Sequence, residues 1–320
     1  MKSSIEEENM THTKKNIIVV GGPTASGKTR LSVSLALALN GEIISADSRQ
    51  IYRGMDIGTG KDLNEYTTKS GKVPYHLIDI VDPSTLYTLY HYQRDCFDAI
   101  ERIWKKQKIP IIVGGTGLYI EAVLKNYKIP NIPENKELRK SLMEKTKEEL
   151  LIQLKKTDPA LYNSTDKSSK KRIVRSIEIA ESSAKQNIQY GMKKSLTLIP
   201  LIICIEWPWN ALKEKIKYRL NQRLSEGLVE EVKNLLNSGI SMSRFEYFGM
   251  EYKHIARHIN KETSYSKMVD ELTRNIFHLA KRQMTYFRGM QRRGLSINWI
   301  NGLDLDKALN LINKEKYISY

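Results

Sequence analysis

The chain has 320 residues, of which 40% are hydrophobic and 28% charged, and its net charge is +16. This composition is typical of a soluble globular protein, and the lack of a bilayer-length apolar stretch excludes an integral membrane protein. Residues 1–14 lack the apolar core of a secretory signal, so we expect a disordered tail and a cytoplasmic protein. Cys96 and Cys204 form no CxxC pair, which argues against a zinc site or a disulfide framework, and both fall in apolar patterns typical of core residues.

Short β-branched runs alternate with helical patterns in the first half of the chain. Helices are expected at residues 28–39 and 89–107, and strands at residues 16–20, 42–45, 75–80 and 109–113. Alternation of this kind predicts βαβ units, and therefore an α/β fold in which helices flank a parallel sheet.

The alternation of β-branched runs and helical patterns stops after about residue 127. Residues 128–189 are rich in Lys and Glu and lack β-branched runs, which predicts an all-helical insertion. A strand is expected again at residues 196–207, so the core is discontinuous and combines residues 15–127 with residues 190–320. The remainder is expected to be helical, with helices at residues 209–224, 228–237 and 265–290.

The strongest local motif is GPTASGKT at residues 22–29, which fits GxxxxGK[ST] between an expected strand and an expected helix. Such a loop turns its backbone N–H groups and a helix N-terminus toward a bound phosphate. Lys28 would neutralise a phosphate oxygen, and the Thr29 hydroxyl would ligate Mg²⁺. The motif predicts phosphate binding without defining the phosphate compound.

Two further strand ends carry polar residues. Asp47 lies in SADSRQIYRGMDIGT, after the strand at 42–45, and Thr116 lies in GGTGLY, after the strand at 109–113. Ligands of open α/β folds bind at these carboxyl ends. Asp47 is therefore a candidate general base or outer ligand of a metal, with capping of the following segment as the alternative. Thr116 is a candidate to bond a leaving-group oxygen, with a ligand-free tight turn as the alternative.

The segment at residues 275–299 contains no acidic residue, and AKRQMTYFR at residues 280–288 interleaves basic and aromatic side chains. With the net charge of +16, this pattern favours phosphate contact and stacking on the bases of a nucleic acid. A solvated basic face and a merely lysine-rich composition remain the alternatives.

GPTASGKT, ISADSRQIYRGMDIGT, HLIDIVDP, IPIIVGGTGLY, RLSEGLVEEV and AKRQMTYFR occur in this order. In this arrangement the chain resembles the tRNA dimethylallyltransferase (isopentenyltransferase) family of bacterial type, over residues 16–300. The resemblance implies transfer of a dimethylallyl group from dimethylallyl diphosphate to the adenosine 3′ of the anticodon in tRNA, with Mg²⁺ as cofactor. It also implies a P-loop NTPase-like core, and we expect a monomer.

The resemblance further implies roles for particular residues. Asp47 is the base for the adenine amine, Thr116 assists at the diphosphate with Lys28, and the helical insertion embraces the anticodon stem. The implied diphosphate site is Gly22, Pro23, Thr24, Ala25, Ser26, Gly27, Lys28, Thr29 and Arg219. The implied tRNA contacts are Asp47, Ser48, Gln50, Lys281, Arg282, Gln283 and Arg288, with Gln50 on the flipped adenine.

Departures from the family pattern fall mainly among the RNA contacts. Residues 276–279 read IFHL where the family usually has TRxY, Tyr286 replaces a tryptophan, and Lys215 replaces an arginine. Residues 247–253 read YFGMEYK in place of an IGYKE-like segment. The chain shows no C-terminal zinc-finger extension of the eukaryotic type.

Three other functions compete with this reading. A P-loop kinase of a small metabolite leaves the SADSRQIYRGMDIGT run without a role. A transferase that prenylates free AMP or ADP needs no helical RNA clamp. A catalytically idle RNA-binding protein is hard to reconcile with intact Lys28, Asp47 and Thr116.

Overall fold

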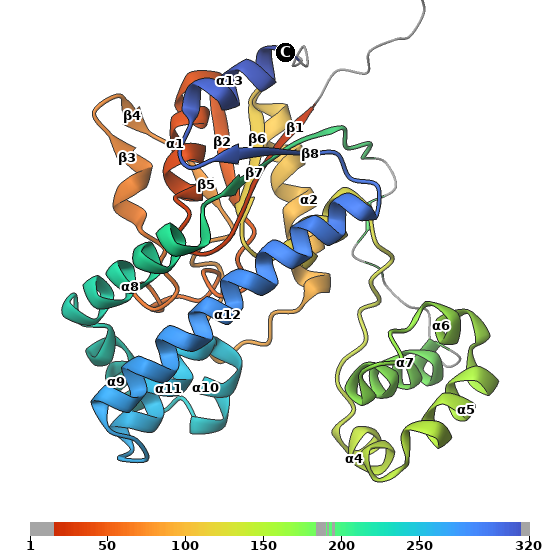
Figure 1. The fold of residues 1–320 in the computed structure, drawn as a ribbon. Helices are drawn as coiled ribbons and strands as arrows, with labels where there is room; N and C mark the ends of the chain where they lie inside the picture. The colour runs from red at the N-terminus through yellow and green to blue at the C-terminus, as the bar shows by residue number, and fades with distance from the viewer. Residues whose placement is uncertain (1–15, 184–189, 191, 194–195, 315–320) are drawn as a thin grey trace, which may run out of the picture. The chain divides into compact units, whose positions relative to one another are not determined.

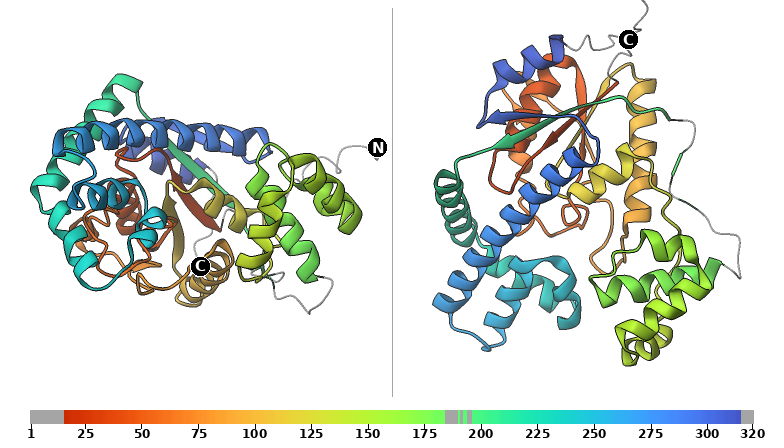
Figure 2. Two further views of the ribbon diagram at one scale, coloured as in Figure 1. Left: turned by 90° about the horizontal axis from the view of Figure 1, so that it is seen from below. Right: turned by 45° about the vertical axis from the view of Figure 1, so that its right-hand side comes forward.

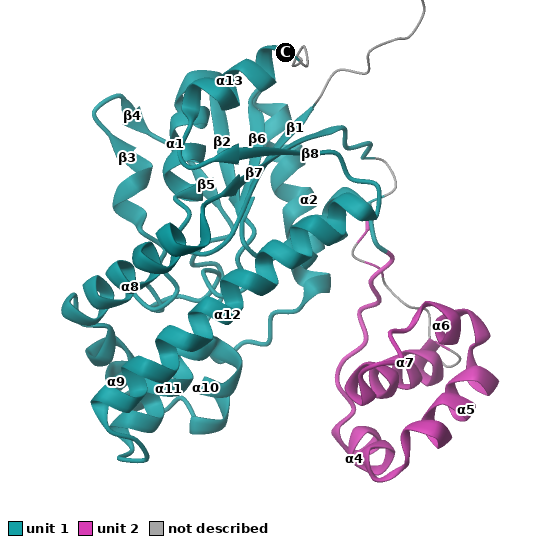
Figure 3. Ribbon diagram, viewed as in Figure 1, with its two compact units in different colours: residues 1–127, 193–320 teal, residues 128–192 magenta. Residues whose placement is uncertain are grey.

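The computed structural model describes residues 16–183, 190, 192–193 and 196–314. The tail expected at residues 1–14 and the last part of the expected insertion, residues 184–189, lie outside the described residues. The chain divides into two compact units: Met1–Tyr127 with Lys193–Tyr320, and Lys128–Met192 (Figure 3).

The first unit is built on a six-stranded sheet in which all neighbouring strands are parallel. The strands in spatial order are β5 (Tyr75–His76), β2 (Gly41–Ser45), β6 (Ile109–Gly114), β1 (Ile17–Gly21), β7 (Pro200–Glu206) and β8 (Ile297–Asn301). The predicted parallel α/β fold is therefore confirmed (Figure 1).

Helices cover both faces of this sheet because alternate residues of each buried strand point to opposite sides. Ile18 and Val20 pack with apolar residues of α1 (Lys28–Leu39) and α13 (Leu305–Lys314). Ile17 and Val19 pack on the other face, where the covering helices are α2 (Leu89–Lys105), α3 (Gly117–Leu124) and the C-terminal part of α12 (Tyr265–Arg292). Figure 2 shows the two layers from two further directions. Cys96 and Cys204 are both buried, as predicted.

A helical layer packs against the loop that follows β2. Ile51, Tyr52 and Met55 of this loop share a core with the helices of the C-terminal half. These helices are α9 (Leu228–Asn237), α10 (Met242–Phe248) and α11 (Met250–Ile259), preceded by α8 (Trp209–Ser225). A 3₁₀ turn, η1 (Leu63–Tyr66), and a short hairpin, β3 (Thr67–Thr68) and β4 (Gly71–Lys72), complete the loop region. The core therefore fixes the segment that carries Asp47 and Gln50.

Two expectations about strands were wrong. The strand predicted at residues 75–80 ends at His76, because Leu77 (φ 62°) and Asp79 (φ 56°) are left-handed and leave the ladder. The C-terminal remainder, expected to be wholly helical, contains β8, which pairs with β7 through Ile297 and Trp299.

The second unit contains four helices: α4 (Lys136–Glu144), α5 (Lys147–Thr157), α6 (Pro159–Ser164) and α7 (Lys170–Ser183). As the composition predicted, every regular element described here is a helix. Leu142, Leu150, Leu154 and Ile173 form its apolar core. A capping box at Thr146 begins α5, which explains the break after α4.

Among the described residues, none of the helices is both long and apolar enough to cross a membrane.

Candidate active site

The GPTASGKT segment forms the turn between β1 and α1. The chain enters α1 at Gly27 with a φ of 87°, no side chain caps the first turn, and that turn holds no acidic residue. The free N–H groups and the positive end of the helix are therefore available to an anion. Thr24, Lys28 and Thr29 line a cavity of about 410 Å³, which we call the main cavity.

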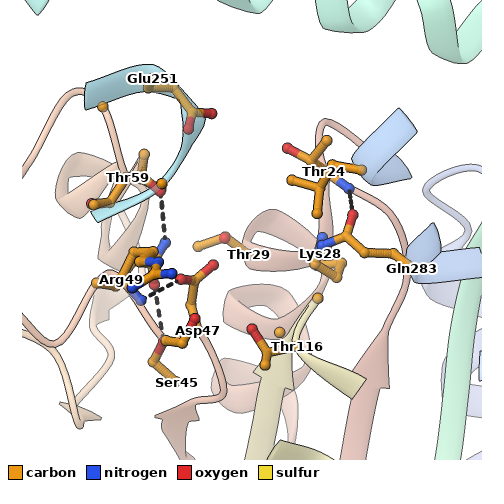
Figure 4. Close-up of a pocket in the computed structure, with 18 of the residues that line it drawn as sticks. Thr24, Lys28, Thr29, Ser45, Asp47, Arg49, Thr59, Thr116, Glu251 and Gln283 are labelled. Atoms are coloured by element: carbon orange, nitrogen blue, oxygen red, sulfur yellow. Dashed lines mark hydrogen bonds between the residues drawn. The ribbon is translucent and has the colours of Figure 1, made fainter. Parts of the chain in front are cut away.

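Parallel pairing of β2 with β6 brings two more predicted residues to the main cavity. The Thr116 backbone N–H donates to the Ala46 carbonyl at 3.3 Å. A Cβ on Gly114 would lie 2.2 Å from the same carbonyl, so this close approach requires glycine. As a result Asp47, Lys28, Thr29 and Thr116 border one open space (Figure 4).

Asp47 holds its own loop with one oxygen. Its Oδ1 accepts a hydrogen bond from the Arg49 backbone N–H at 2.8 Å, so the turn-capping role predicted as the alternative is present. The hydrogen bonds of the described residues leave Oδ2 without a donor. The same carboxylate therefore anchors the turn with one oxygen and keeps a second oxygen without a hydrogen-bond donor among the described residues that line the cavity.

Lys28 is held against the GPTASGKT segment, residues 22–29, which we call the phosphate loop. Its Nζ donates to the Pro23 carbonyl at 2.6 Å. Burial, and then the nearby Arg219, lower the pKa of Lys28 to about 8, although Asp47 acts in the opposite direction. A half-buried cation near a second cation is stabilised by a bound anion, so this position favours phosphate.

Glu231 of α9 fixes the loop that forms another wall of the main cavity. Its carboxylate accepts hydrogen bonds from the backbone N–H groups of Asp56 (2.8 Å), Ile57 (2.7 Å) and Gly58 (3.0 Å). The Tyr252 hydroxyl donates to the same carboxylate at 2.7 Å. Gly58 lines the cavity, so a residue remote in sequence sets the position of this wall.

Replacing Glu231 with alanine is expected to lower the free energy of unfolding by about 2–4 kcal/mol, because four donors lose their acceptor. Urea denaturation measures this loss. Glu230→Ala, which removes the exposed neighbouring carboxylate, is the control and should change stability by less than about 0.5 kcal/mol. Equally small losses in both variants would show that the carboxylate does not hold the loop.

The two glutamines predicted to contact RNA line the main cavity and brace its loops. Gln50 accepts from the Ser45 hydroxyl at 2.9 Å and donates to the Gly60 carbonyl at 2.9 Å. Gln283 accepts from the Thr24 backbone N–H at 2.8 Å. Both amides thus have partners inside the protein, and their contacts to adenine and RNA stay predictions.

The predicted RNA-binding cations of α12 lie in different places. Ser48 and Arg282 both line the main cavity. Arg282 also lines a groove of about 600 Å³ along α12, which we call the basic groove. Lys281 lines that groove, with its Nζ 5.0 Å from the centre of the Trp209 ring. Arg288 lines neither space and is exposed near Trp299. The groove therefore adjoins the main cavity at Arg282.

Arg219 reaches the main cavity from α8 and forms an ion pair with Asp62. Sequence motifs did not predict Gly60, Arg223 or Glu251, which line the same cavity. Arg223 follows Arg219 by four residues, a spacing that puts both on one helix face and could have indicated it. Burial raises the pKa of the Glu251 carboxyl at the start of α11.

The GPTASGKT loop after β1, with polar side chains that line one cavity beyond the ends of adjacent parallel strands, defines an α/β protein of the P-loop class. Residues 50–290 match the family model described as IPP transferase, and residues 15–75 match the one described as isopentenyl transferase. The chain belongs to the tRNA dimethylallyltransferase family, whose members are prenyl-transferring enzymes.

Relatives resemble the chain over nearly its whole length. It is 46% identical to tRNA dimethylallyltransferase 1 of Syntrophus aciditrophicus, covering 91% of this chain and 95% of the relative. It is 47% identical to tRNA dimethylallyltransferase 2 of Bacteroides fragilis, in an alignment that covers 96% of this chain and 99% of the relative. The crystal structure of a tRNA isopentenylpyrophosphate transferase from Bacillus halodurans superimposes with a TM-score of 0.67 at 30% identity. The superposition covers 94% of this chain and 98% of that one.

Proposed function

We propose that this protein transfers a dimethylallyl group from dimethylallyl diphosphate to the exocyclic amine of the adenosine 3′ of the anticodon in tRNA. One observation carries the proposal: a carboxylate, a lysine and a threonine from the segments that follow three adjacent strands border one cavity, and a basic groove adjoins it. Membership of the tRNA dimethylallyltransferase family supports the same reaction.

The diphosphate would bind at the phosphate loop, with Lys28, Arg219 and the Thr116 hydroxyl around it. The reaction breaks the bond between the allylic carbon and a diphosphate oxygen and forms a bond between that carbon and the adenine nitrogen. Negative charge develops on the leaving diphosphate. Cations and N–H groups fixed where this charge appears lower the barrier.

Magnesium fits the residues present. No group of three or more His, Cys, Asp or Glu residues suited to a metal occurs among the described residues. Mg²⁺ is commonly held by one or two protein oxygens together with substrate phosphates and water. The Thr29 hydroxyl, with Asp47 lining the same cavity, is a donor set of this kind. When bound, the ion would neutralise diphosphate charge.

Asp47 would act as the general base. The adenine amine is a weak nucleophile because its lone pair is delocalised into the ring, so it must lose a proton as the new bond forms. The free Oδ2 of Asp47 can take that proton, while Oδ1 stays in the turn. The adenine must leave its stack to reach the main cavity, which makes base flipping part of the proposal.

The groove with Lys281 and Arg282 supports binding of the anticodon stem-loop by phosphate contacts. The insertion, Lys128–Met192, is proposed as a second tRNA contact. The proposal also includes action as a monomer and a cytoplasmic location, where the tRNA substrate is found.

Comparing acceptors tests the function. With saturating dimethylallyl diphosphate, kcat/KM for an anticodon stem-loop is expected to exceed that for free AMP by several orders of magnitude. Remote binding energy from the RNA orients the adenine, and AMP cannot supply it. Comparable values for the two acceptors would favour the free-nucleotide transferase instead. Phosphorylation of a small metabolite, the kinase alternative, is not favoured by the family match.

A further inference from the structure

Arg223 of α8 lies where two cavities meet. The main cavity adjoins a second one of about 640 Å³ beneath α8, which we call the α8 cavity. Four residues line both: Lys28, Thr29, Arg219 and Arg223. Three of them are cations and the fourth carries a hydroxyl. This junction therefore has the composition of a site for a multiply charged anion.

The charge of Arg223 is not paired within the described structure. Arg219 is neutralised by Asp62, but no carboxylate of the described residues lies within ion-pair distance of Arg223. The Nε of Arg223 is buried without a partner, and its Nη1 has only a long contact of 3.5 Å to the Gly58 carbonyl. Burial, and then Arg219, lower the pKa of Arg223 to about 10, so the group remains protonated at neutral pH.

Gly60 makes room for this guanidinium. A Cβ at residue 60 would lie 1.5 Å from Nη2 of Arg223 and 2.7 Å from Nη2 of Arg219. Residue 60 also has a φ of +60°. The Gly60 loop, whose carbonyl is held by Gln50, therefore admits both arginines to the cavity only because it has no side chain here.

We propose that Arg223 is a second arginine of the diphosphate site, which binds the leaving group together with Lys28, Thr29 and Arg219. The inference rests on the proposed function. A diphosphate monoester carries more than one negative charge, whereas Asp62 already offsets Arg219. A planar guanidinium can bind two phosphate oxygens at once. A diphosphate is favoured over an RNA phosphate because Arg223 shares its position with the phosphate-loop residues and does not line the basic groove of α12.

Calorimetric titration with inorganic pyrophosphate and Mg²⁺ tests the proposal. Arg223→Met removes the charge and keeps a long apolar side chain. We expect its Kd for pyrophosphate, and its KM for dimethylallyl diphosphate, to rise about 10–100-fold. Its Kd for the anticodon stem-loop should stay within about threefold of wild type. Lys217→Met removes an exposed charge from the same helix and should leave all three values unchanged.

A pair of glycine variants supplies an independent test. Gly60→Ala should weaken pyrophosphate binding as Arg223→Met does, because the added methyl group displaces the guanidinium. Gly54→Ala is the matched control, since residue 54 has a similar φ of +68° but no atom lies within 4 Å of its added Cβ. Gly60→Ala in the Arg223→Met background should lose less than the sum of the two single losses, because displacement of Arg223 is common to both changes and only the contact with Arg219 remains to be disturbed. Thermal unfolding of each variant shows whether it is folded.

The outcomes separate the inference from the function on which it rests. Wild-type pyrophosphate affinity in folded Arg223→Met would overturn the inference alone, and so would a loss confined to stem-loop affinity. Fully additive losses in the double variant would show that Gly60→Ala acts through the backbone or Arg219 and not through Arg223, which would contradict the inference that Gly60 admits Arg223 to the diphosphate site. Failure of the wild-type protein to bind pyrophosphate or dimethylallyl diphosphate would overturn the proposed function itself.

Discussion

Asp47→Asn is expected to fold normally, bind both substrates and lose about 10²–10⁴-fold in single-turnover rate, the contribution typical of a positioned general base. Asparagine keeps an acceptor for the Arg49 N–H, so the turn survives. It cannot take a proton at neutral pH. Rapid-quench kinetics on a stem-loop with saturating dimethylallyl diphosphate measure the chemical step apart from binding.

Asp82→Asn is the matched control for this experiment. Asp82 caps an equivalent turn, in which its Oδ1 accepts from the Ser84 backbone N–H at 2.9 Å, and it lies exposed outside the main cavity. Its rate should match wild type. If Asp47→Asn also kept its rate within a few-fold, Asp47 would be a turn residue only, and the proton would pass to water or to the diphosphate.

Lys28→Ala is expected to raise the KM for dimethylallyl diphosphate by about 10–100-fold and to lower the rate as well, because a hydrogen bond to a charged group is typically worth about 1.5–3 kcal/mol. Affinity for the stem-loop should be nearly unchanged, because the basic groove lies along α12 and does not include Lys28. Fluorescence anisotropy on a labelled stem-loop, beside steady-state kinetics, separates the two. A loss of stem-loop affinity with an unchanged diphosphate KM would contradict this division of the site.

The pKa of Lys28 gives the same prediction a pH dependence. The protonated amine binds the diphosphate, and its pKa in the free protein is about 8. Diphosphate affinity should therefore fall as the pH rises above 8, by roughly fivefold between pH 8 and 9 from the protonated fraction alone. Lys28→Ala should lack this fall.

The stability of the fold depends on pH in the opposite direction. The pKa of Lys28 is lower in the folded protein than in the unfolded chain, so its contribution to the free energy of unfolding rises between about pH 8 and 10.5.

The parts of the site that sequence could predict are those whose position follows from local structure. Asp47 and Thr116 follow the ends of β2 and β6 closely, Lys28 begins the helix after the loop that follows β1, and parallel strands place their carboxyl ends at one edge of the sheet. The family resemblance added Arg219 through its distance from the GLVEEV segment.

Residues that act across long distances in sequence could not be predicted in this way. Glu231 meets the loop at Asp56 through a contact between residues 175 positions apart, and Gln283 meets Thr24 across 259 positions. Arg223 can reach the cavity only because Gly60 has no side chain, and this contact between distant residues is not visible in the sequence. The early end of β5 likewise depends on left-handed residues whose conformation no periodicity indicates.

The most direct test of the central claim is nucleoside mass spectrometry on tRNA incubated with the protein, dimethylallyl diphosphate and Mg²⁺. We predict that adenosine 3′ of the anticodon appears as its N⁶-dimethylallyl derivative, with diphosphate released in equal amount, and that both products are lost together with Asp47→Asn. Unmodified tRNA in the presence of active, folded protein, or a prenyl group found only on free nucleotide, would contradict the account.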